Sequence, residues 1–356
     1  MGQWRGARIF AVSLVTLLAL AGCGSAKGSP ATSAASRAVI IVSGGAATSP
    51  FTTPDHACQS GLAAGNTDTA LRAYLLQQSY TVYTSPAMNG RGPVRDQTGF
   101  GPFGDCPITL DENMTVDATG SIDTAGEHLA RFITYLHDEN GVNEIDLVGH
   151  SMGGLFSRAA IRVLKSTASP VKIRSLTTLG TPWQGSYLSD YANDTVPLGD
   201  CVGDEFCEKG MEGFRAEVLR LVSGSGREVS QAYLMGKDGW NEFQAGVLDS
   251  IPVTLIGGRK FTKEGAVNSA VWPNDGIVAL QSALATDVGD LVLKHRRCYT
   301  FEDTHSIFVS NLAQLPEQTA LTWDPVVLAQ VHSAIEDGPQ ALETTNRQGC
   351  PAPTGG

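Results

Sequence analysis

Short apolar runs alternate with amphipathic segments along much of the chain. Residues 38–42 (AVIIV) are apolar without a break, which is typical of a strand buried on both faces of a parallel sheet. Residues 122–136 carry apolar side chains at helical spacing, and the apolar run at 145–148 leads directly into a second helical pattern at 155–164. This alternation predicts an α/β fold in which helices flank a mostly parallel sheet. The other expected strands cover 80–83, 171–179, 251–256 and 297–301, and the other helices cover 67–78, 213–222 and a late amphipathic segment around 332.

Two stretches interrupt this alternation. Residues 85–118 are rich in Gly, Pro, Asp and Asn, which indicates a long surface loop. Between 181 and 250 the chain offers one expected helix, Gly-rich breaks and two cysteines. An irregular segment of that length inside a compact domain is usually functional, so we expect a cap over an active site at about 183–250. The alternative is a structural excursion without a function.

Composition and charge narrow the class of protein. The 356 residues are 42% hydrophobic, which is enough to bury a core and excludes a wholly disordered chain. There are 25 Lys and Arg against 36 Asp and Glu, so the net charge is −11. A chain this acidic argues against nucleic acid as a partner, because phosphate binding needs a basic surface. No apolar run reaches the roughly 18 residues of a membrane span, so we expect no transmembrane segment. We also expect the protein to be a monomer.

The first 22 residues are expected to direct export. Arg5 and Arg8 precede an apolar run at 9–22, which is too short to span a bilayer but is typical of a signal peptide. The run ends in LAG followed by Cys23, which resembles the lipobox of bacterial lipoproteins. The resemblance implies cleavage before Cys23 and a diacylglyceryl group on its thiol, so the chain would be held at a membrane surface as a cell-envelope lipoprotein. The alternative is an ordinary secretory signal with a chance cysteine. Residues 24–37 are small and polar, as in a flexible tether.

Six further cysteines suggest disulfide bonds. An even number of cysteines in an exported chain favours three bridges, although sequence alone leaves their connectivity open. Zinc is the competing interpretation, but no C-x-x-C pair or adjacent histidine supports it. The suggested pairs are Cys201 with Cys207, which would close a small loop, Cys58 with Cys106, and Cys298 with Cys350.

The motif GHSMG at 149–153 points to nucleophilic catalysis. It follows an expected strand and opens an expected helix, the setting in which a G-x-S-x-G turn raises a serine hydroxyl above the edge of a sheet. The segment 145–154 (IDLVGHSMGG) resembles the nucleophile elbow of bacterial lipases and esterases of the α/β-hydrolase fold. The segment 179–185 (LGTPWQG) resembles the LGTPH-x-G segment of true lipases, with Trp183 in place of the usual histidine. The resemblance implies an α/β-hydrolase fold with a cap, and Ser151 as the nucleophile.

The N-terminal pattern and the resemblance to lipases and esterases together predict the following domain organisation. A signal peptide covers 1–22, a lipid-anchored linker 23–37, an α/β-hydrolase domain 38–345 with the cap at about 183–250, and a C-terminal tail 346–356.

The general base can be sought among seven histidines, because the fold orders its catalytic residues as nucleophile, acid and histidine. Four histidines precede any acid that could follow Ser151, and of these His150 should point away from the elbow. His295 lies in a basic run and is expected to be solvated, and His332 lies in a late helix. His305 lies in a polar loop after the last expected strand, where the family has its general base. The four histidines excluded by order are His56, His128, His137 and His150.

Asp275 is the expected acid. It lies in the turn NDGIV at 274–278, which resembles the N-D-G-x-V segment of the family. Its function there would be to hold the imidazole of His305 in the required tautomer and to stabilise the imidazolium. Two alternatives remain, namely that Asp275 only stabilises the turn or that Asp303 acts in its place. Asp303 is only two residues from His305, an awkward spacing for a side chain that must face it.

An oxyanion hole is expected from two backbone amides. One is that of Met152, the residue after the nucleophile. The other should come from the loop after the first strand, SGGA at 43–46, where relatives of this family carry His-Gly. Gly45 is favoured there because glycine lets the backbone approach the substrate, and Ala46 is the alternative.

No cofactor is expected. The sequence lacks a Walker A motif, a G-x-G-x-x-G after a strand and an H-E-x-x-H. Asp200, Asp204, Glu205 and Glu208 could hold Ca²⁺, but a solvated acidic loop is the favoured interpretation, and we expect no metal.

These features together predict a carboxylic ester hydrolase acting on an ester or lipid, with a triacylglycerol lipase as the favoured subclass. Two other functions are compatible with the sequence. The same triad could transfer the acyl group to an alcohol or sugar, or the fold could serve as a non-catalytic binding protein at the cell surface.

Overall fold

The computed structural model describes most of the chain after the expected export segment. It covers residues 36–56, 67–94, 96–97, 101–102, 108–220, 225–344 and 347–353. The suggested lipidation site Cys23 and the suggested pair Cys58 and Cys106 lie outside the described residues.

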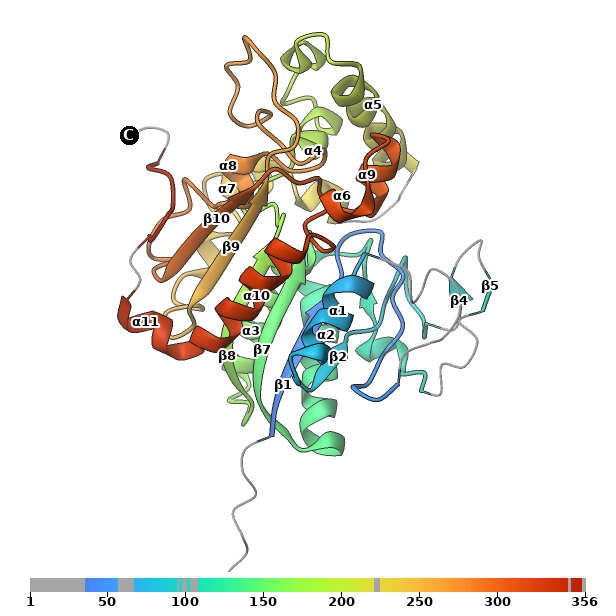
Figure 1. Ribbon diagram of the computed structural model, residues 1–356, viewed down its shortest axis with the longest axis vertical. Coiled ribbons are helices and arrows are strands. Elements are labelled where there is room, and N and C mark those ends of the chain that lie inside the picture. The colour runs from blue at the N-terminus through green and yellow to red at the C-terminus, as the bar shows by residue number, and fades with distance from the viewer. Residues whose placement is uncertain are drawn as a thin grey trace, which may run out of the picture. The chain divides into compact units, whose positions relative to one another are not determined.

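A six-stranded sheet, with the order β10-β9-β8-β7-β1-β2, forms the centre of the fold (Figure 1). Every neighbouring pair of strands in it is parallel. The carboxyl ends of all six strands therefore meet at one edge, where loops from distant parts of the chain can come together. The strands are β1 (Ser36–Val42), β2 (Val82–Thr84), β7 (Val142–His150), β8 (Lys172–Leu179), β9 (Val253–Gly258) and β10 (Arg296–Phe301).

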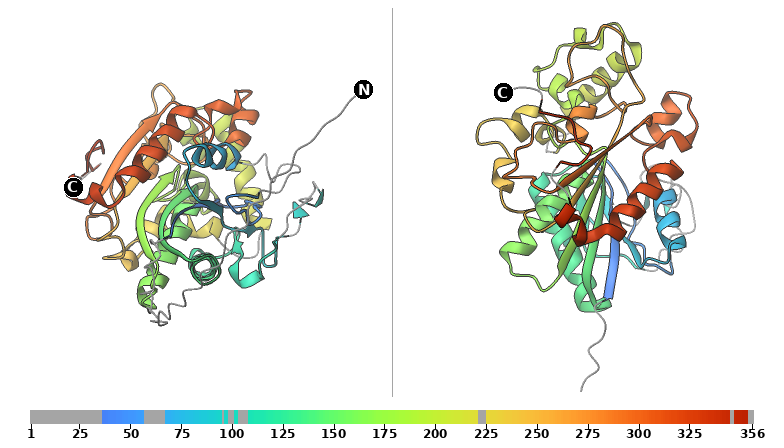
Figure 2. Two further views of the ribbon diagram at one scale, coloured as in Figure 1. Left: turned by 60° about the horizontal axis from the view of Figure 1, so that its bottom comes forward. Right: turned by 60° about the vertical axis from the view of Figure 1, so that its left-hand side comes forward.

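Helices cover both faces of this sheet (Figure 2). Alternate residues of β1 point to opposite faces, so Ile40 joins the core under α2 (Ile122–Asn140) and α3 (Gly153–Ser166). Its neighbours Val39 and Ile41 join the other core, under α1 (Thr69–Gln77) and α10 (Pro325–Asp337). The unbroken apolar run at 38–42 is explained by this burial on both sides, and the predicted α/β architecture is confirmed.

Local signals set the ends of the helices on these faces. The Ser121 side chain accepts a hydrogen bond from the Thr124 amide at the start of α2, and Gly141 ends the helix with a left-handed φ of 68°. At α10, Asp324 caps the amide of Val326 at 2.7 Å, and Pro325 occupies the first turn, where its missing N–H costs nothing.

Three expected elements differ from the structure. The stretch at 85–118 is not only a surface loop, because it contributes β3 (Ala87–Met88) and β6 (Val116–Asp117), which pair with each other and bury Ala87 and Val116. It also holds β4 (Asp96–Gln97), β5 (Gly101–Pro102) and the short helix η2 (Glu112–Met114). The helix expected at 213–222 starts earlier, as α5 (Glu205–Arg220), since Asp204 accepts the Cys207 amide at 3.0 Å in its first turn. Strand β1 begins at Ser36, so the last two residues of the expected linker belong to the sheet.

The segment between β8 and β9 stands over the carboxyl edge of the sheet (Figure 1). Two short helices lie between β8 and α5, and three more lie between α5 and β9. They are α4 (Tyr187–Ala192), η3 (Leu198–Cys201), α6 (Ser225–Glu228), α7 (Gln231–Met235) and η4 (Glu242–Gln244). The later elements are α8 (Leu280–Ala283), α9 (Ile307–Leu312), η5 (Glu317–Thr319), η6 (Gly338–Gln340) and α11 (Ala341–Thr344).

Two disulfide bonds are present in the described part of the chain, and both are pairs that the sequence suggested. Cys201 bonds to Cys207 beside α5, and Cys298 of β10 bonds to Cys350. The second bond ties residues near the C-terminus to the edge strand, where the Cys298 amide also donates to the Gln348 carbonyl at 3.0 Å.

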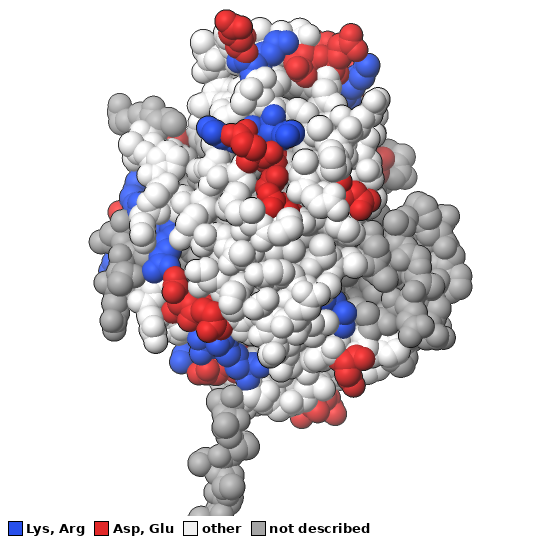
Figure 3. Space-filling model, in the orientation of Figure 1, with Lys and Arg blue, Asp and Glu red and all other residues white. Residues whose placement is uncertain are grey.

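Charge is mixed on the surface. On the face shown in Figure 3, Lys and Arg side chains of the described residues stand beside Asp and Glu side chains, around a wide uncharged area. Among the described residues, no helix combines the length and the apolar character that crossing a bilayer requires.

Candidate active site

Ser151 occupies a sharp turn between β7, which ends at His150, and α3, which begins at Gly153. Its φ of 55° lies in the left-handed region, which a residue with a side chain rarely adopts. The Ser151 amide donates to the Leu179 carbonyl at 2.8 Å, and the Thr181 hydroxyl donates to the Ser151 carbonyl at 2.7 Å. The turn is thus held from the neighbouring strand, β8.

The glycines of the motif are explained by close packing of the backbone. A side chain at Gly149 would place its Cβ 2.5 Å from the backbone nitrogen of Gly154. At Gly153 the Cβ would lie 2.1 Å from the Val42 carbonyl oxygen, at the end of β1. Any larger residue would push α3 away from the sheet, and Ser151 with it.

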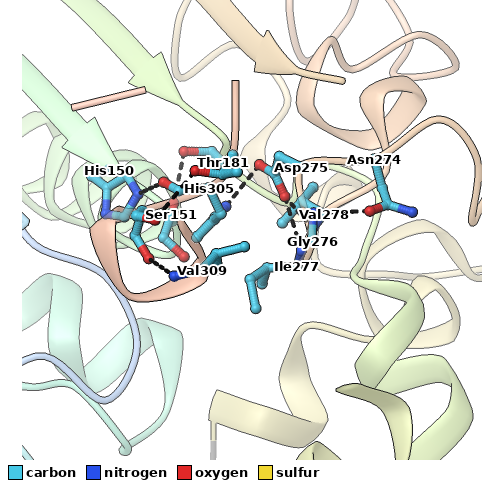
Figure 4. Close-up of polar contacts among 12 residues, drawn as sticks. His150, Ser151, Thr181, Asn274, Asp275, Gly276, Ile277, Val278, His305 and Val309 are labelled. Atoms are coloured by element: carbon cyan, nitrogen blue, oxygen red, sulfur yellow. Dashed lines mark hydrogen bonds and ion pairs between the residues drawn. The ribbon is translucent and has the colours of Figure 1, made fainter. Parts of the chain in front are cut away.

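Asp275 lies in the loop after β9 and is completely buried. One carboxylate oxygen, Oδ1, accepts hydrogen bonds from the amides of Ile277 at 3.0 Å and Val278 at 2.7 Å. The other, Oδ2, accepts from Nδ1 of His305 at 2.8 Å (Figure 4). The tight turn therefore orients the carboxylate, and its second oxygen is directed at the imidazole.

His305 lies in the loop after β10 and is 5% exposed. Its backbone amide donates to the Asp275 carbonyl at 2.8 Å, so the two residues are joined through backbone and side chain. Figure 4 shows His305 with Asp275 on one side and Ser151 and His150 on the other. Gly180 lies against the pair, because a Cβ there would be 2.9 Å from both Oδ2 of Asp275 and Nδ1 of His305.

A cavity of about 590 Å³ lies at the carboxyl edge of the sheet, and Ser151, Met152 and His305 all line it. Polar residues such as Asn89 and Thr119 form one part of its wall. The rest of the wall is largely apolar and comes from α5, α9 and the loops near them, through Phe214, Val218, Val229, Ile277, Phe308 and Leu312.

The loop after β1 also reaches the elbow. At Gly44 a Cβ would lie 2.4 Å from the Cβ of Ser151, and at Gly45 it would lie 2.7 Å from the sulfur of Met152. The amide of Ala46 donates to the Ala118 carbonyl at 3.1 Å and is therefore not available to a ligand. Ser43, at the start of the loop, donates a hydrogen bond to buried Asp68. Burial raises the pKa of Asp68 to about 6.

Asp303, the alternative acid, does not face His305. It is buried and hydrogen-bonds to Asp324, the cap of α10. Burial and the neighbouring Asp324 raise the pKa of Asp303 to about 8. The histidines at 128, 137 and 332 also pair elsewhere, with the carbonyls of Thr115 and Val142 and with the hydroxyl of Tyr80.

His150 corrects one prediction, because it does not point away from the site. Its Nε2 lies 2.8 Å from the carbonyl oxygen of His305, and the centroids of the two imidazole rings are 4.8 Å apart. Burial, together with the charge of His305, lowers the pKa of His150 to about 3. No sequence pattern could reveal this contact, because the two residues are separated by 155 positions.

Trp183, which replaces the family histidine, has a structural partner that the sequence did not suggest. The guanidinium of Arg158 lies between two indole rings, 4.1 Å from the centroid of Trp183 and 4.7 Å from that of Trp240. Asn241 accepts from Arg158 at 2.7 Å and donates to the Trp183 carbonyl at 2.8 Å. Burial lowers the pKa of Arg158 to about 9.

The acidic residues near α5 have other contacts. Asp200 accepts from the Asn268 side chain at 2.7 Å, Asp204 caps the Cys207 amide, and Glu205 pairs with Lys209. Within the described residues, no group of three or more Asp, Glu, His or Cys side chains is arranged to hold a metal ion.

Topology and site agree on the fold. The turn at Ser151 follows β7, Asp275 follows β9 and His305 follows β10, so residues in the order serine, aspartate and histidine meet at the carboxyl edge of one parallel sheet. The fold is that of an α/β-hydrolase. The turn at Ser151, the turn at Asp275 and the loop of His305 follow three separate strands of that sheet.

Comparisons with known proteins bear on the segment around the elbow. The family described as "Putative serine esterase (DUF676)" matches residues 107–197, about a quarter of the chain, and this range includes Ser151. A triacylglycerol lipase of Pseudarthrobacter phenanthrenivorans is 35% identical over 71 residues, which are 20% of this chain and 21% of that protein. A triacylglycerol lipase of Burkholderia plantarii is also 35% identical over 71 residues, which are 18% of its length. The chain thus matches about a fifth of the length of these curated relatives.

Solved structures of lipases and esterases are also similar. The mature form of the Bacillus licheniformis lipase BlEst2 is 13% identical with a TM-score of 0.47, covering 84% of this chain and 92% of that one. An esterase of Pyrococcus furiosus is 14% identical with a TM-score of 0.44, covering 85% and 82% of the two chains.

Proposed function

We propose that this protein hydrolyses carboxylic esters through an acyl-enzyme formed on Ser151. The observation that carries the proposal is the buried Asp275–His305 pair, 2.8 Å between Oδ2 and Nδ1, on the cavity that Ser151 also lines. A serine hydroxyl is a weak nucleophile on its own, and an adjacent oriented imidazole is what activates it. The similarity of the elbow segment to serine esterases and triacylglycerol lipases supports the same reaction.

The proposed reaction has two halves. Nε2 of His305 takes the proton of the Ser151 hydroxyl while Oγ attacks the ester carbonyl, and the tetrahedral intermediate collapses when the imidazolium gives its proton to the departing alcohol. Water then attacks the acyl-enzyme with the same help, and the carboxylic acid leaves. Asp275 keeps the Nδ1–H tautomer of His305 and stabilises its positive charge, because its Oδ2 can only accept a hydrogen bond from Nδ1.

We propose that the backbone amides of Met152 and Gly45 bind the oxyanion. Met152 stands next to the nucleophile at the amino end of α3, where the helix dipole favours negative charge. Among the two residues suggested in the loop after β1, Gly45 is supported because the Ala46 amide already donates to Ala118. Gly45 lies close to Met152, as the 2.7 Å approach of a Cβ to its sulfur indicates.

The cavity wall supports an ester with an apolar acyl group, and a lipase is the favoured subclass. Phe214 and Val218 of α5 belong to the segment between β8 and β9, which we propose is a cap over the site. Leu312 of α9 lines the same wall and is 75% exposed, so the apolar lining continues to the surface. Burying a hydrocarbon chain along such a wall contributes about 0.8 kcal/mol per methylene.

We further propose that the mature chain is exported and held at a membrane surface by lipid on Cys23. The two disulfide bonds support an oxidising compartment, since such bonds are rare in the cytosol. Mass spectrometry of the purified protein would test the anchor, because a diacylglyceryl group on Cys23 requires a mature chain that starts there.

The function is tested by hydrolysis of p-nitrophenyl esters with acyl chains from C2 to C16, using Ser151→Ala as the control. We expect hydrolysis that rises toward longer chains and falls by several orders of magnitude in a folded Ser151→Ala protein. Full activity in that variant would exclude Ser151 as the nucleophile. Activity confined to the shortest esters would exclude the lipase subclass but keep the esterase mechanism. A folded protein inactive on every ester would overturn the hydrolase proposal.

A further inference from the structure

His150 makes a contact that the triad mechanism does not use. Its Nε2 lies 2.8 Å from the backbone carbonyl oxygen of His305, and both residues are 5% exposed. We propose that His150 is a positioning residue, which holds the loop of the general base His305 at a fixed place relative to the nucleophile Ser151. This inference rests on the proposed function, because it assigns His150 a part in the same reaction.

The loop of His305 is held from two directions. Asp275 binds it on one side, through the His305 amide at 2.8 Å and Nδ1 at 2.8 Å. Neither bond connects that loop to the elbow, which comes from β7 and α3. The bond from His150 supplies this connection, since His150 is the last residue of β7 and is covalently joined to Ser151.

The geometry also determines which ring nitrogen of His150 carries the proton. A carbonyl oxygen only accepts hydrogen bonds, so Nε2 of His150 must be the protonated nitrogen. Burial lowers the pKa of His150 to about 3, so the ring is neutral at neutral pH. A neutral ring is required here, because an imidazolium 4.8 Å away would repel the positive charge that His305 gains during the reaction.

The elbow transmits this contact rigidly. The Ser151 amide is bound to the Leu179 carbonyl at 2.8 Å and its carbonyl to the Thr181 hydroxyl at 2.7 Å, so the nucleophile does not move independently of β8. Because Ser151 is held to β8, the hydrogen bond between Nε2 of His150 and the His305 carbonyl sets the separation of the nucleophile Ser151 from the base His305. A misplacement of about 1 Å in such a pair can cost about 100-fold in rate.

Two matched amides test the proposal in the full-length protein. In His150→Gln, the amide nitrogen is separated from Cα by the same number of bonds as Nε2 of histidine, so it can donate to the His305 carbonyl. In His150→Asn, the amide is one bond shorter and falls short of it. We expect kcat for an ester substrate to fall by about 10- to 100-fold in His150→Asn, with KM changed less than about threefold. In His150→Gln we expect kcat within about threefold of the natural protein.

Several results would overturn the proposal. Equal kcat values in the two variants, or a fall in His150→Asn that appears in KM alone, would show that the hydrogen bond does not position the base. Should His150→Asn fail to fold, as judged by thermal unfolding, His150→Phe, which keeps a ring and lacks the donor, replaces it in the comparison. If no donor-free variant folds while His150→Gln does, the residue serves stability and the proposal is wrong.

Labelling with a fluorophosphonate separates this proposal from the proposed function. The natural protein must react at Ser151 for the function to stand, because only an activated serine attacks the reagent. With that reaction established, slower labelling of His150→Asn than of His150→Gln supports positioning, and equal labelling rates contradict it. An unlabelled natural protein would instead reject the proposed function.

Discussion

Asp275 holds His305 at two points, through a 2.8 Å hydrogen bond from Nδ1 to Oδ2 and a 2.8 Å hydrogen bond from the His305 amide to the Asp275 carbonyl. Only the first bond depends on the carboxylate. Replacing the side chain therefore separates the orientation of the imidazole from the placement of its loop.

For this reason Asp275→Asn should lose activity without unfolding. The amide can present its N–H to Nδ1 and stabilise the wrong tautomer, so kcat should fall by about 10⁴-fold. Asp303→Asn is the matched control, because Asp303 hydrogen-bonds to Asp324. This variant should keep kcat within about threefold of its natural value. Ester hydrolysis and thermal unfolding of both proteins give the answer, and equal losses of kcat would reject Asp275 as the acid.

A side chain at Gly180 should push Asp275 and His305 apart, because it would collide with both of them. Its φ is 58°, and a Cβ would lie 2.9 Å from both Oδ2 of Asp275 and Nδ1 of His305, so Gly180→Ala should lower kcat by at least about 10-fold. Gly141→Ala carries the same backbone penalty of about 1–2 kcal/mol, with φ of 68° and no atom near its Cβ. Both variants should lose stability, and only Gly180→Ala should lose activity. Unchanged kcat in a folded Gly180→Ala protein would contradict the geometry described for the pair.

The oxyanion donor that we propose at Gly45 can be removed with proline, which has no N–H. We expect Gly45→Pro to lower kcat by about 10²- to 10³-fold, the loss typical of one oxyanion donor. Gly45→Ala keeps the amide, and its one close contact is with the flexible Met152 side chain, at 2.7 Å from the sulfur, so most of its activity should remain. If folded Gly45→Pro hydrolyses esters as fast as Gly45→Ala, another amide binds the oxyanion.

Arg158 is expected to stabilise the protein through its planar guanidinium. Arg158→Lys cannot stack between Trp183 and Trp240 in the same way and changes the 2.7 Å bond to Asn241, so the free energy of unfolding should fall by about 2 kcal/mol. Arg162→Lys, on the same helix and in a partly exposed ion pair with Asp123, should change it by less than about 1 kcal/mol. Urea denaturation of both proteins measures the difference, and equal values would show that stacking contributes little.

The buried pair of Asp303 and Asp324 predicts a pH dependence of stability. The folded state raises the pKa of Asp303 from 3.8 to about 8, chiefly by burial and then by Asp324, while Lys260 lowers it and Glu302 raises it. The folded protein thus binds this proton more tightly than the unfolded chain, so the contribution of Asp303 to stability is greatest below about pH 4 and is lost as the pH rises toward 8.

Asp303→Asn lacks that titration and keeps a donor for Asp324. Its free energy of unfolding, relative to that of the natural protein, should therefore increase between pH 5 and pH 8.5. Urea denaturation at the two pH values tests this, and a relative stability that stays constant or decreases would contradict the raised pKa of Asp303.

Some features followed from local sequence because their causes are local. The run at 38–42 is apolar without a break, so it predicted a strand buried on both faces, and the helical spacing at 122–136 predicted α2. The elbow at Ser151 was visible because backbone contacts within a few residues demand glycine at positions 149 and 153. Chain order then excluded four of the seven histidines. The expected loop after the last strand favoured His305, and the resemblance of the turn NDGIV favoured Asp275.

Tertiary structure decided what depends on residues far apart in the chain. Spacing left Asp275 and Asp303 both open as the proposed acid, and the folded chain gives them different partners, His305 for Asp275 and Asp324 for Asp303. The contact of His150 with His305 and the stacking of Arg158 between two indoles leave no periodic signal, since they join separate crossings of the sheet. The sequence by itself determined the strands of the central sheet and the elbow, because these depend on neighbouring residues. The orientation of His305 and the partners of the buried charges required the folded chain, because burial and distance exist only there.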